Sequence, residues 1–351
     1  MNLPSILLAA LLSSSLTTAL NLRKRYDEAP FKPTKCAVKA KVTQTAACPI
    51  SGLPDSTGGI TLTIAPEPTS WSKPSPSSLF QVVLQNNTEV RASVDDGIDV
   101  YDIDIDSSAA TFASLIGAGK YVVCYFSAGT METWRSDFGC FNHNLGAQDL
   151  GCDVGGPWAN EFWVNTSSTE VRKIMQARIQ RAADLGCSAI DPDNMDGYGN
   201  QNGIGATEED SISYVKFLSR EARSRGMGIS LKNALEILPN VTSDVDFGVN
   251  EQCNEYDECD SYTPFWALPT PLPVFNIEYP PHNKDNWTEK YAEKSCDESL
   301  DWGYPYMFTD LKNYPTVTCA VSRCTEDGPS PAVPNGGLVI PSGCVDGMQY
   351  N

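Results

Sequence analysis

The chain has 351 residues, enough to bury the core of one large α/β domain or of two smaller ones. Its 44 acidic and 25 basic side chains give a formal net charge of −19, which disfavours nucleic acid and anionic membranes as partners and would attract a cationic ligand. Only two histidines are present, so we expect neither a multi-histidine zinc site nor Ser-His-Asp chemistry, and no metal or other cofactor.

The N-terminal stretch indicates a secreted, extracellular protein. Residues 1–20 form an apolar segment that serines interrupt, which favours a signal peptide over a retained membrane anchor. Residues 21–25 would be a propeptide ending at the dibasic pair Lys24-Arg25, as in fungal secreted proteins. Twelve cysteines without a Cys-x-x-Cys pair and four Asn-x-Ser/Thr sequons also fit an oxidising compartment and a glycoprotein. We expect a monomer.

Residues 26–78 are rich in Pro, Thr and Ser, and we expect an extension and linker ahead of a main domain at 79–351. Cys36 and Cys48 are expected to close a small loop within this extension. A small disulfide-stapled sugar-binding module is the alternative for the same residues. The tail of the main domain, from Cys319 onward, is irregular and carries further cysteines.

From Leu79 onward, short apolar runs alternate with amphipathic helical stretches. The expected strands lie at 80–84, 100–105, 121–126, 187–190, 228–231, 246–249, 273–277 and 304–308. Helices are expected from Ser167 to a stop at Gly186 and from a capping box at Thr207 to Gly226. Strands that alternate with helices pair in parallel, and about eight of them favour a (β/α)₈ TIM-type barrel. An open doubly wound sheet is the alternative, but no glycine-rich phosphate loop follows the first strand.

Three carboxylates follow the expected strand that ends at Ile190: Asp191, Asp193 and Asp196. Parallel strands place active sites at their carboxyl ends, and crowded carboxylates repel one another, so that at least one is expected to titrate abnormally. A solvated turn is the alternative, because acids and glycines are common in turns. A calcium-binding EF-hand loop fits poorly, since Met195 occupies the position of the third acid.

Other strand ends carry further acids, which makes glycoside hydrolysis by two facing carboxylates the favoured chemistry. Glu251, Glu278 and Asp104 join the three aspartates as candidates. The remaining expected substrate-binding residues are aromatic, basic or amide side chains, namely Tyr125, Trp134, Tyr198, Arg135, Lys232 and Asn250. Aromatic rings can stack on sugars, and the basic groups can hold hydroxyls or tune a carboxylate. We also expect Cys253 and Cys259 to form a local disulfide behind Glu251.

Several of these motifs occur together, in an order that resembles glycoside hydrolase family 114, the endo-α-1,4-polygalactosaminidase family. The resembling motifs are Tyr101-Asp-Ile-Asp-Ile105, Val123-Cys-Tyr-Phe-Ser-Ala-Gly129, Trp134-Arg135, Asp193-Asn-Met-Asp-Gly-Tyr198, Leu231-Lys-Asn233, Val249-Asn-Glu-Gln-Cys253 and Val274-Phe-Asn-Ile-Glu-Tyr279. The resemblance covers about residues 79–312. It implies a (β/α)₈ barrel that cleaves α-1,4-linked galactosamine polymers internally, with Asp193 as nucleophile and Glu251 as proton donor and then base of a retaining mechanism.

The acidic charge agrees with that substrate, since deacetylated galactosamine is cationic. A catalytically silent protein that binds a cationic aminosugar polysaccharide is the alternative function, because fold and motif alone do not prove turnover. A metal-dependent polysaccharide deacetylase would need a histidine-rich site, which two histidines do not readily supply.

Overall fold

The computed structural model describes Cys48 and the ranges 62–66, 70–75, 78–84, 89–92, 94, 98–156 and 158–278, together with strands at 306–309, 320–325 and 328–331. The expected signal peptide, the propeptide and most of the expected extension lie outside the described residues.

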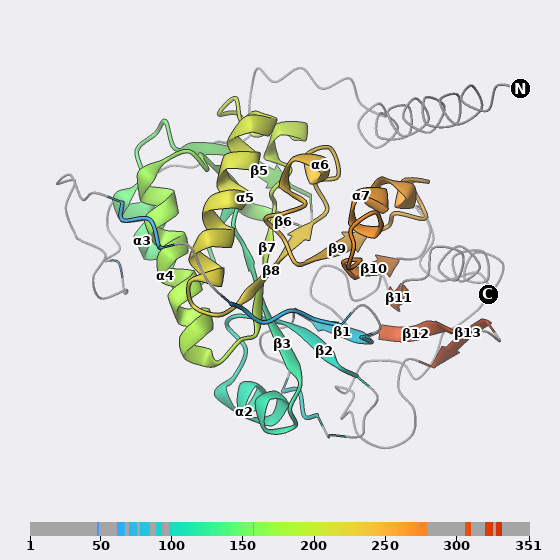
Figure 1. The fold of residues 1–351 in the computed structure, drawn as a ribbon. Helices are drawn as coiled ribbons and strands as arrows, with labels where there is room; N and C mark the ends of the chain where they lie inside the picture. Colours follow the sequence, from blue (N-terminus) through green and yellow to red (C-terminus); the bar gives the residue numbers. More distant parts are fainter. Residues whose placement is uncertain are drawn as a thin grey trace, which may run out of the picture.

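Within this described part, eight parallel strands form one sheet that curls into a nearly closed barrel (Figure 1). In sheet order they are β1 (Phe80–Val83), β2 (Val100–Asp104), β3 (Tyr121–Ser127), β7 (Ala189–Asp193), β8 (Gly228–Lys232), β9 (Phe247–Glu251), β10 (Val274–Glu278) and β11 (Tyr306–Thr309). Curling brings Phe80 of β1 against Phe275 of β10, with ring centroids 4.8 Å apart. The predicted barrel is thereby confirmed, and the open doubly wound sheet is wrong. An antiparallel pair, β12 (Ala320–Thr325) and β13 (Gly328–Pro331), extends the sheet beyond β11.

Helices cover the outside of the barrel. They are α2 (Ala109–Gly117), α3 (Phe138–Asn144), α4 (Thr169–Leu185), α5 (Glu208–Arg223), α6 (Leu238–Val241) and α7 (Thr263–Trp266). Two expected helix ends are confirmed: Gly186 caps α4 in the left-handed conformation, and Thr207 and Asp210 form the capping box of α5. The α4 helix starts at Ser168 without a side-chain cap, rather than at a box on Ser167. Figure 1 shows α4 and α5 side by side on one flank of the strands.

The barrel interior changes from apolar to polar along strands β2, β7 and β9. Its apolar layer consists of Phe80, Val82, Val100, Val123, Ala189, Phe247, Val249, Phe275 and Ile277. Side chains alternate with a period of two, so the residues that continue this inward row of β7 are Asp191 and Asp193. The same reasoning places Glu251 above Val249 on β9. The carboxyl end of the barrel is therefore where its carboxylates converge.

A second sheet lies between β3 and α4, which the alternation of strands and helices did not predict. It has three antiparallel strands in the order β4 (Thr130–Glu132), β6 (Trp158–Val164) and β5 (Leu150–Gly155). Because it begins three residues after β3 ends, this sheet stands at the carboxyl end of the barrel. Its buried polar side chains therefore border the site described below.

The described residues 62–66 and 70–75 pack along the barrel and do not run free as a linker would. The backbone N–H of Ala65 donates to Glu221 Oε1 of α5 at 2.9 Å, and the Trp71 indole donates to Asp246 Oδ1 at 2.8 Å. Ser72 donates to the carbonyl of Gly226, ahead of β8. This segment therefore contacts the amino ends of strands β8 and β9, opposite the expected site.

Disulfides tie the described cysteines together. Cys48 bonds Cys140 of α3, so the predicted loop between Cys36 and Cys48 is wrong. Sequence spacing could not show this, because residues 92 positions apart are joined. The predicted pair Cys253–Cys259 is confirmed, and Cys124 and Cys187 form another disulfide.

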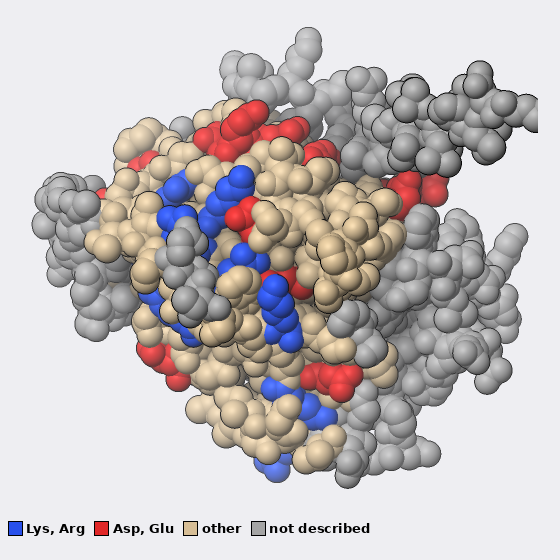
Figure 2. Space-filling view, viewed as in Figure 1, with Lys and Arg blue, Asp and Glu red and all other residues tan. Residues whose placement is uncertain are grey.

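Charge is distributed unevenly over the surface. On the face seen in Figure 2, Lys and Arg side chains run through the middle, and Asp and Glu lie mainly towards the edge. Despite the net charge of −19, acidic side chains do not cover this face evenly. No helix among the described residues is long and apolar enough to cross a membrane.

Candidate active site

Two carboxylates meet above one buried ammonium group. Asp193 ends β7, Glu251 ends β9, and Lys232 ends β8, the strand between them. Lys232 Nζ lies 3.7 Å from Asp193 Oδ2 and 3.5 Å from Glu251 Oε2. The Lys232 side chain is 2% exposed, whereas those of Asp193 and Glu251 are 18% and 23% exposed. A ligand at the barrel mouth can therefore reach both carboxylates while the cation stays beneath them.

Lys232 remains charged despite its burial. Burial by itself lowers the pKa of an amine, but the surrounding carboxylates outweigh it and raise the pKa of Lys232 well above its ordinary value. In order of effect, those carboxylates belong to Asp193, Glu251, Asp191 and Asp102. The cation compensates negative charge that would otherwise crowd the mouth.

Hydrogen bonds to both oxygens fix the carboxylate of Asp193. The Tyr125 hydroxyl donates to Oδ2 at 2.8 Å, and the backbone N–H of Asn194 donates to Oδ1 at 2.8 Å. Burial, followed by the charge of Asp193, raises the pKa of Tyr125 well above its ordinary value, so the hydroxyl keeps the proton it donates. Tyr125 thus acts on the carboxylate and not as a stacking surface alone.

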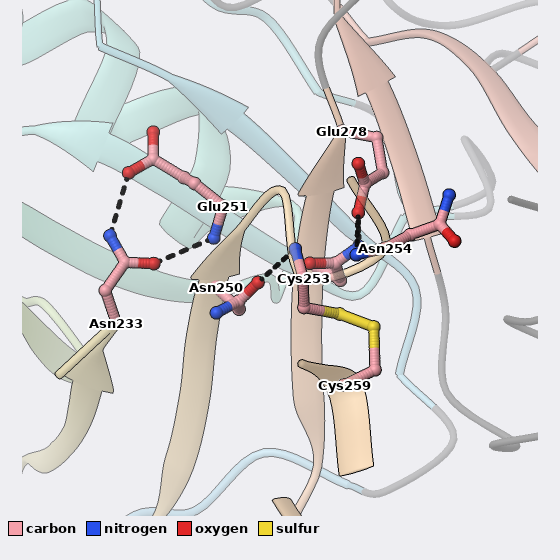
Figure 3. Close-up of a disulfide and its surroundings, with 8 residues drawn as sticks. Asn233, Asn250, Glu251, Cys253, Asn254, Cys259 and Glu278 are labelled. Atoms are coloured by element: carbon pink, nitrogen blue, oxygen red, sulfur yellow. Dashed lines mark hydrogen bonds between the residues drawn. A yellow bond between two sulfur atoms is a disulfide. The ribbon is translucent and has the colours of Figure 1, made fainter. Parts of the chain in front are cut away.

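Asn233 holds Glu251 through a reciprocal pair of hydrogen bonds (Figure 3). Its Nδ2 donates to Glu251 Oε2 at 3.0 Å, and its Oδ1 accepts from the backbone N–H of Glu251 at 2.9 Å. Asn233 adopts a positive φ of 49°, which asparagine tolerates better than most residues. Asn233 lies in the resembling motif Leu231-Lys-Asn233 but was not among the expected site residues; its place directly after Lys232 at a strand end was the available signal.

Comparison with known proteins decides the family. The family model of glycoside-hydrolase family GH114 matches residues 61–325. The chain belongs to glycoside hydrolase family GH114. A comparison with curated proteins finds no match.

Solved structures agree with this GH114 assignment. The chain is 38% identical to Ega3 of Aspergillus fumigatus, solved in complex with galactosamine, over 72% of this chain and 99% of that one, with a TM-score of 0.64. The glycoside hydrolase domain of PelA from Pseudomonas aeruginosa is 16% identical over 70% and 99% of the two chains, with a TM-score of 0.50. The latter similarity shows the fold alone.

The floor of the GH114 site is a pair of buried carboxyls, Asp191 and Asp102. Both have raised pKa values, that of Asp191 to about 6 and that of Asp102 well above its usual range, chiefly because of burial and then, for Asp102, because of Asp191. The buried atoms Asp102 Oδ1 and Asp191 Oδ2 accept no hydrogen bond from another group among the described residues, so a proton held between the two carboxyls would satisfy both. Asp191 also accepts a hydrogen bond from Ser230, and it has no exposed surface. The structure therefore places Asp191 below Asp193 and Glu251, out of direct reach of a ligand.

Asp102 was not among the residues expected from the sequence. The signal was its alternation with Val100 and Asp104 on β2, which places all three on the inward row. In a barrel, this alternation does not show which side chains point inward, because both faces of each strand are buried.

Arg135 lies at the edge of the mouth, with Asp104, in a buried ion-pair network. Arg135 Nη1 contacts Asp104 Oδ1 at 2.8 Å and Asp106 Oδ2 at 3.2 Å, and Nε donates to Glu132. The guanidinium carbon lies 6.0 Å from the centroid of the Tyr125 ring. These contacts position Arg135 to support Tyr125, and Asp104 to hold Arg135.

Glu278 and Asn250 lie away from this group, on the outer face of their strands (Figure 3). Glu278 is fully buried and accepts from the backbone N–H of Asn254 at 2.9 Å. Asn250 accepts from the backbone N–H of Cys253 at 2.9 Å. Both side chains shape the loop closed by the Cys253–Cys259 disulfide.

Three expected residues stand at the rim. Trp134 is 53% exposed and offers the flat apolar surface expected of a sugar platform. Tyr198 donates its hydroxyl proton to Glu236 Oε2 at 2.8 Å. Asp196 is half-buried in the turn after β7, where its carbonyl accepts from Asn200.

Proposed function

We propose that this GH114 enzyme is a secreted, endo-acting hydrolase of α-1,4-linked galactosamine polymers that retains anomeric configuration. The observation that carries the proposal is the pair of accessible carboxylates, Asp193 and Glu251, on either side of Lys232. Glycoside hydrolysis requires two such carboxyl groups flanking the scissile bond. Retention requires them to lie close together, about 5–5.5 Å apart, and a single ammonium group in contact with both fits that requirement.

Asp193 is the proposed nucleophile, because donors on both of its oxygens hold the carboxylate in one orientation. It attacks the anomeric carbon and forms a covalent glycosyl-enzyme. Glu251 donates its proton to the departing glycosidic oxygen, and Lys232 and Asn233 then stabilise the carboxylate that remains. In the second half-reaction, Glu251 takes a proton from the water that releases the sugar.

Two observations support an aminosugar substrate. Ega3, at 38% identity, was solved in complex with galactosamine. The net charge of −19 would attract a polymer of ammonium-bearing sugars and repel nucleic acid and anionic membranes. We propose that Trp134 at the rim stacks on one ring of that polymer.

Disulfides among the described cysteines support an extracellular location, since such bonds persist in oxidising compartments. We propose that Lys24-Arg25 is processed and that the enzyme acts in the medium as a monomer.

The decisive experiment incubates the purified protein with fully deacetylated, partly deacetylated and fully acetylated polygalactosamine and identifies the products by mass spectrometry. Internal cleavage of the deacetylated polymer to mixed oligomers is the expected result. Binding without any cleavage would favour a silent sugar-binding protein. Cleavage of the acetylated polymer alone would refute the cationic substrate.

A further inference from the structure

The turn that follows Asp193 is held by the corner between β3 and β4. The carbonyl of Asp193 accepts from the backbone N–H groups of Ala128 and Gly129, at 2.9 and 3.1 Å. A Cβ on Gly129 would lie 1.7 Å from the carbonyl oxygen of Asn194, so only glycine permits this approach. The corner between β3 and β4 therefore fixes the backbone of Asp193 and Asn194.

Asn194, the next residue, adopts a left-handed conformation with φ of 62°. Asparagine tolerates this conformation better than most residues, and surrounding contacts hold it in place. Here the Asn194 amide Nδ2 donates to Ser127 Oγ at 2.8 Å and to Glu161 Oε1 at 3.0 Å. The backbone N–H of the same residue donates to Asp193 Oδ1. One asparagine therefore connects the carboxylate of Asp193 to Glu161.

Glu161 closes a ring of hydrogen bonds around this amide. The Thr130 hydroxyl donates to Glu161 Oε1, which leaves the Ser127 hydroxyl to donate to Thr130 Oγ1 and to accept from Asn194. Glu161 lies on β6, outside the barrel, and is 5% exposed. Each donor of the ring has an acceptor, so the amide of Asn194 has one satisfied orientation.

The electrostatic setting of Glu161 suits an uncharged anchor. Burial, and next the charge of Glu132 on the facing strand, raise the pKa of Glu161 to about 8. The other charged groups that face it are Asp193, which also raises this pKa, and Arg135, which lowers it. The raised pKa favours the protonated form, in which Oε2 carries the proton because Oε1 accepts both hydrogen bonds, and this form adds no negative charge beside Asp193.

We propose that Glu161 is a positioning residue for Asp193, acting through Thr130 and the Asn194 side chain to fix the backbone N–H that orients the Asp193 carboxylate. The inference rests on the proposed role of Asp193 as nucleophile. The three-stranded sheet between β3 and α4 would then help to position Asp193 through Glu161.

Substitution of Glu161 gives the first test, with hydrolysis of deacetylated α-1,4-galactosamine oligomers as the assay. Glu161→Ala should lower kcat by about tenfold to a hundredfold and leave KM within a few-fold, because misplacement of a reacting group by about 1 Å has effects of that size. Glu161→Gln should restore most of the rate, since its amide oxygen accepts both hydrogen bonds. Asp153→Asn is the matched control, because among the described residues this carboxylate of the same small sheet accepts only from the backbone N–H groups of Gly155 and Asn160. Its kcat should be unchanged.

A double-mutant cycle with Asn194→Gly gives the second test. Glycine tolerates the positive φ but lacks the amide, so Asn194→Gly should lower kcat, and Glu161→Ala should add no further loss in that background. The inference would be overturned if the kcat losses of the two single variants multiplied in the double variant. It would also be overturned if Glu161→Ala had the kcat of the wild type, or if Glu161→Ala and Glu161→Gln lost equal activity. If Asp193→Asn itself remains active, the proposed function fails; if only that variant is inactive while Glu161→Ala is fully active, the positioning role alone fails.

Discussion

The barrel carries an ionic cluster at each end, and the two clusters have opposite ratios of cations to carboxylates. At the amino end, Asp246 has no exposed side-chain surface and accepts from Trp71 and Arg223 at 2.8 and 3.0 Å, with Lys73 at 3.2 Å. At the carboxyl end, Lys232 alone lies between two carboxylates, at longer distances, and both carboxylates stay partly exposed.

The difference separates a structural cluster from one that is suited to the proposed reaction. A buried carboxylate with several donors has little to gain from a new partner, and its loss leaves cations buried without compensation. Accessible carboxylates that share one cation can exchange that contact for a substrate, and their charge becomes useful when a proton or a glycosyl group is transferred. Substitutions at the two ends should therefore affect different measurements.

The largest expected effect is at the carboxyl end. Asp193→Asn and Glu251→Gln should each lower kcat by about 10²–10⁴-fold, because each removes a group that reacts in the transition state. Thermal unfolding should change little, since both side chains are accessible. Glu278→Gln is the matched control on the next strand, where the carboxyl faces the outer side; hydrolysis should persist. An equal loss for Glu278→Gln would break the distinction between inward and outward acids.

At the amino end, Asp246→Ala should lower the free energy of unfolding by about 3–5 kcal/mol, because Arg223 stays buried without its partner. Chemical denaturation measures this change, and kcat well below the melting temperature should equal that of the wild type. Lys73→Ala sharpens the comparison: the Lys73 side chain is 50% exposed, so its removal should cost no more than about 1 kcal/mol. A loss of kcat in Asp246→Ala at unchanged stability would contradict the separation of the two ends.

A smaller effect concerns pH and the carboxyl pair beneath Lys232. Burial raises the folded-state pKa values of Asp102 and Asp191, so the pair favours the folded state below the ordinary carboxyl pKa and loses that contribution as pH rises through the raised values. Asp102→Asn supplies a permanent donor to Asp191 and removes one of the two titrations. The melting temperature of the variant relative to the wild type should therefore increase from about pH 4 to about pH 7. A difference independent of pH would show that the pair shares no proton.

The smallest expected effect is that of salt. If acidic groups attract a cationic polymer, KM should rise modestly between low and physiological ionic strength while kcat stays constant. A neutral, fully acetylated polymer is the matched control for binding. If the affinity for the deacetylated polymer does not change with ionic strength, the net charge does not attract the substrate and serves solubility only.

The sequence was sufficient to predict the barrel. Strands that alternate with helices pair in parallel, and about eight such strands favour closure of the sheet. The sequence was also sufficient to place Asp193, Glu251 and Lys232 at strand ends, where the structure brings them together. The three-stranded sheet was missed because β4 to β6 are an excursion between β3 and α4. Their role depends on tertiary contacts of Glu161 that no local pattern encodes.

The sequence did not predict which side chains of each strand face the barrel interior. Inward and outward positions of a barrel strand are both buried, so alternation alone does not say whether Glu278 faces the mouth. Its neighbour Ile277 fills the barrel interior, which turns Glu278 outward to the backbone of Asn254. Asp191 and Asp102 face inward yet lie one layer too deep to meet a ligand. Depth along the strand is a property of the closed barrel and becomes visible only in three dimensions.

In the proposed mechanism, Asp193 forms a covalent bond to the sugar, and Glu251 assists the formation and hydrolysis of that bond. The most direct measurement reacts Glu251→Gln with an aryl α-galactosaminide whose leaving group needs no proton. Intact-protein mass spectrometry, followed by peptide mapping, should then find one galactosaminyl group on Asp193, because the variant lacks the base that releases it. An adduct on any other residue, or rapid turnover to the inverted anomer without an adduct, would contradict the retaining mechanism with Asp193 as nucleophile.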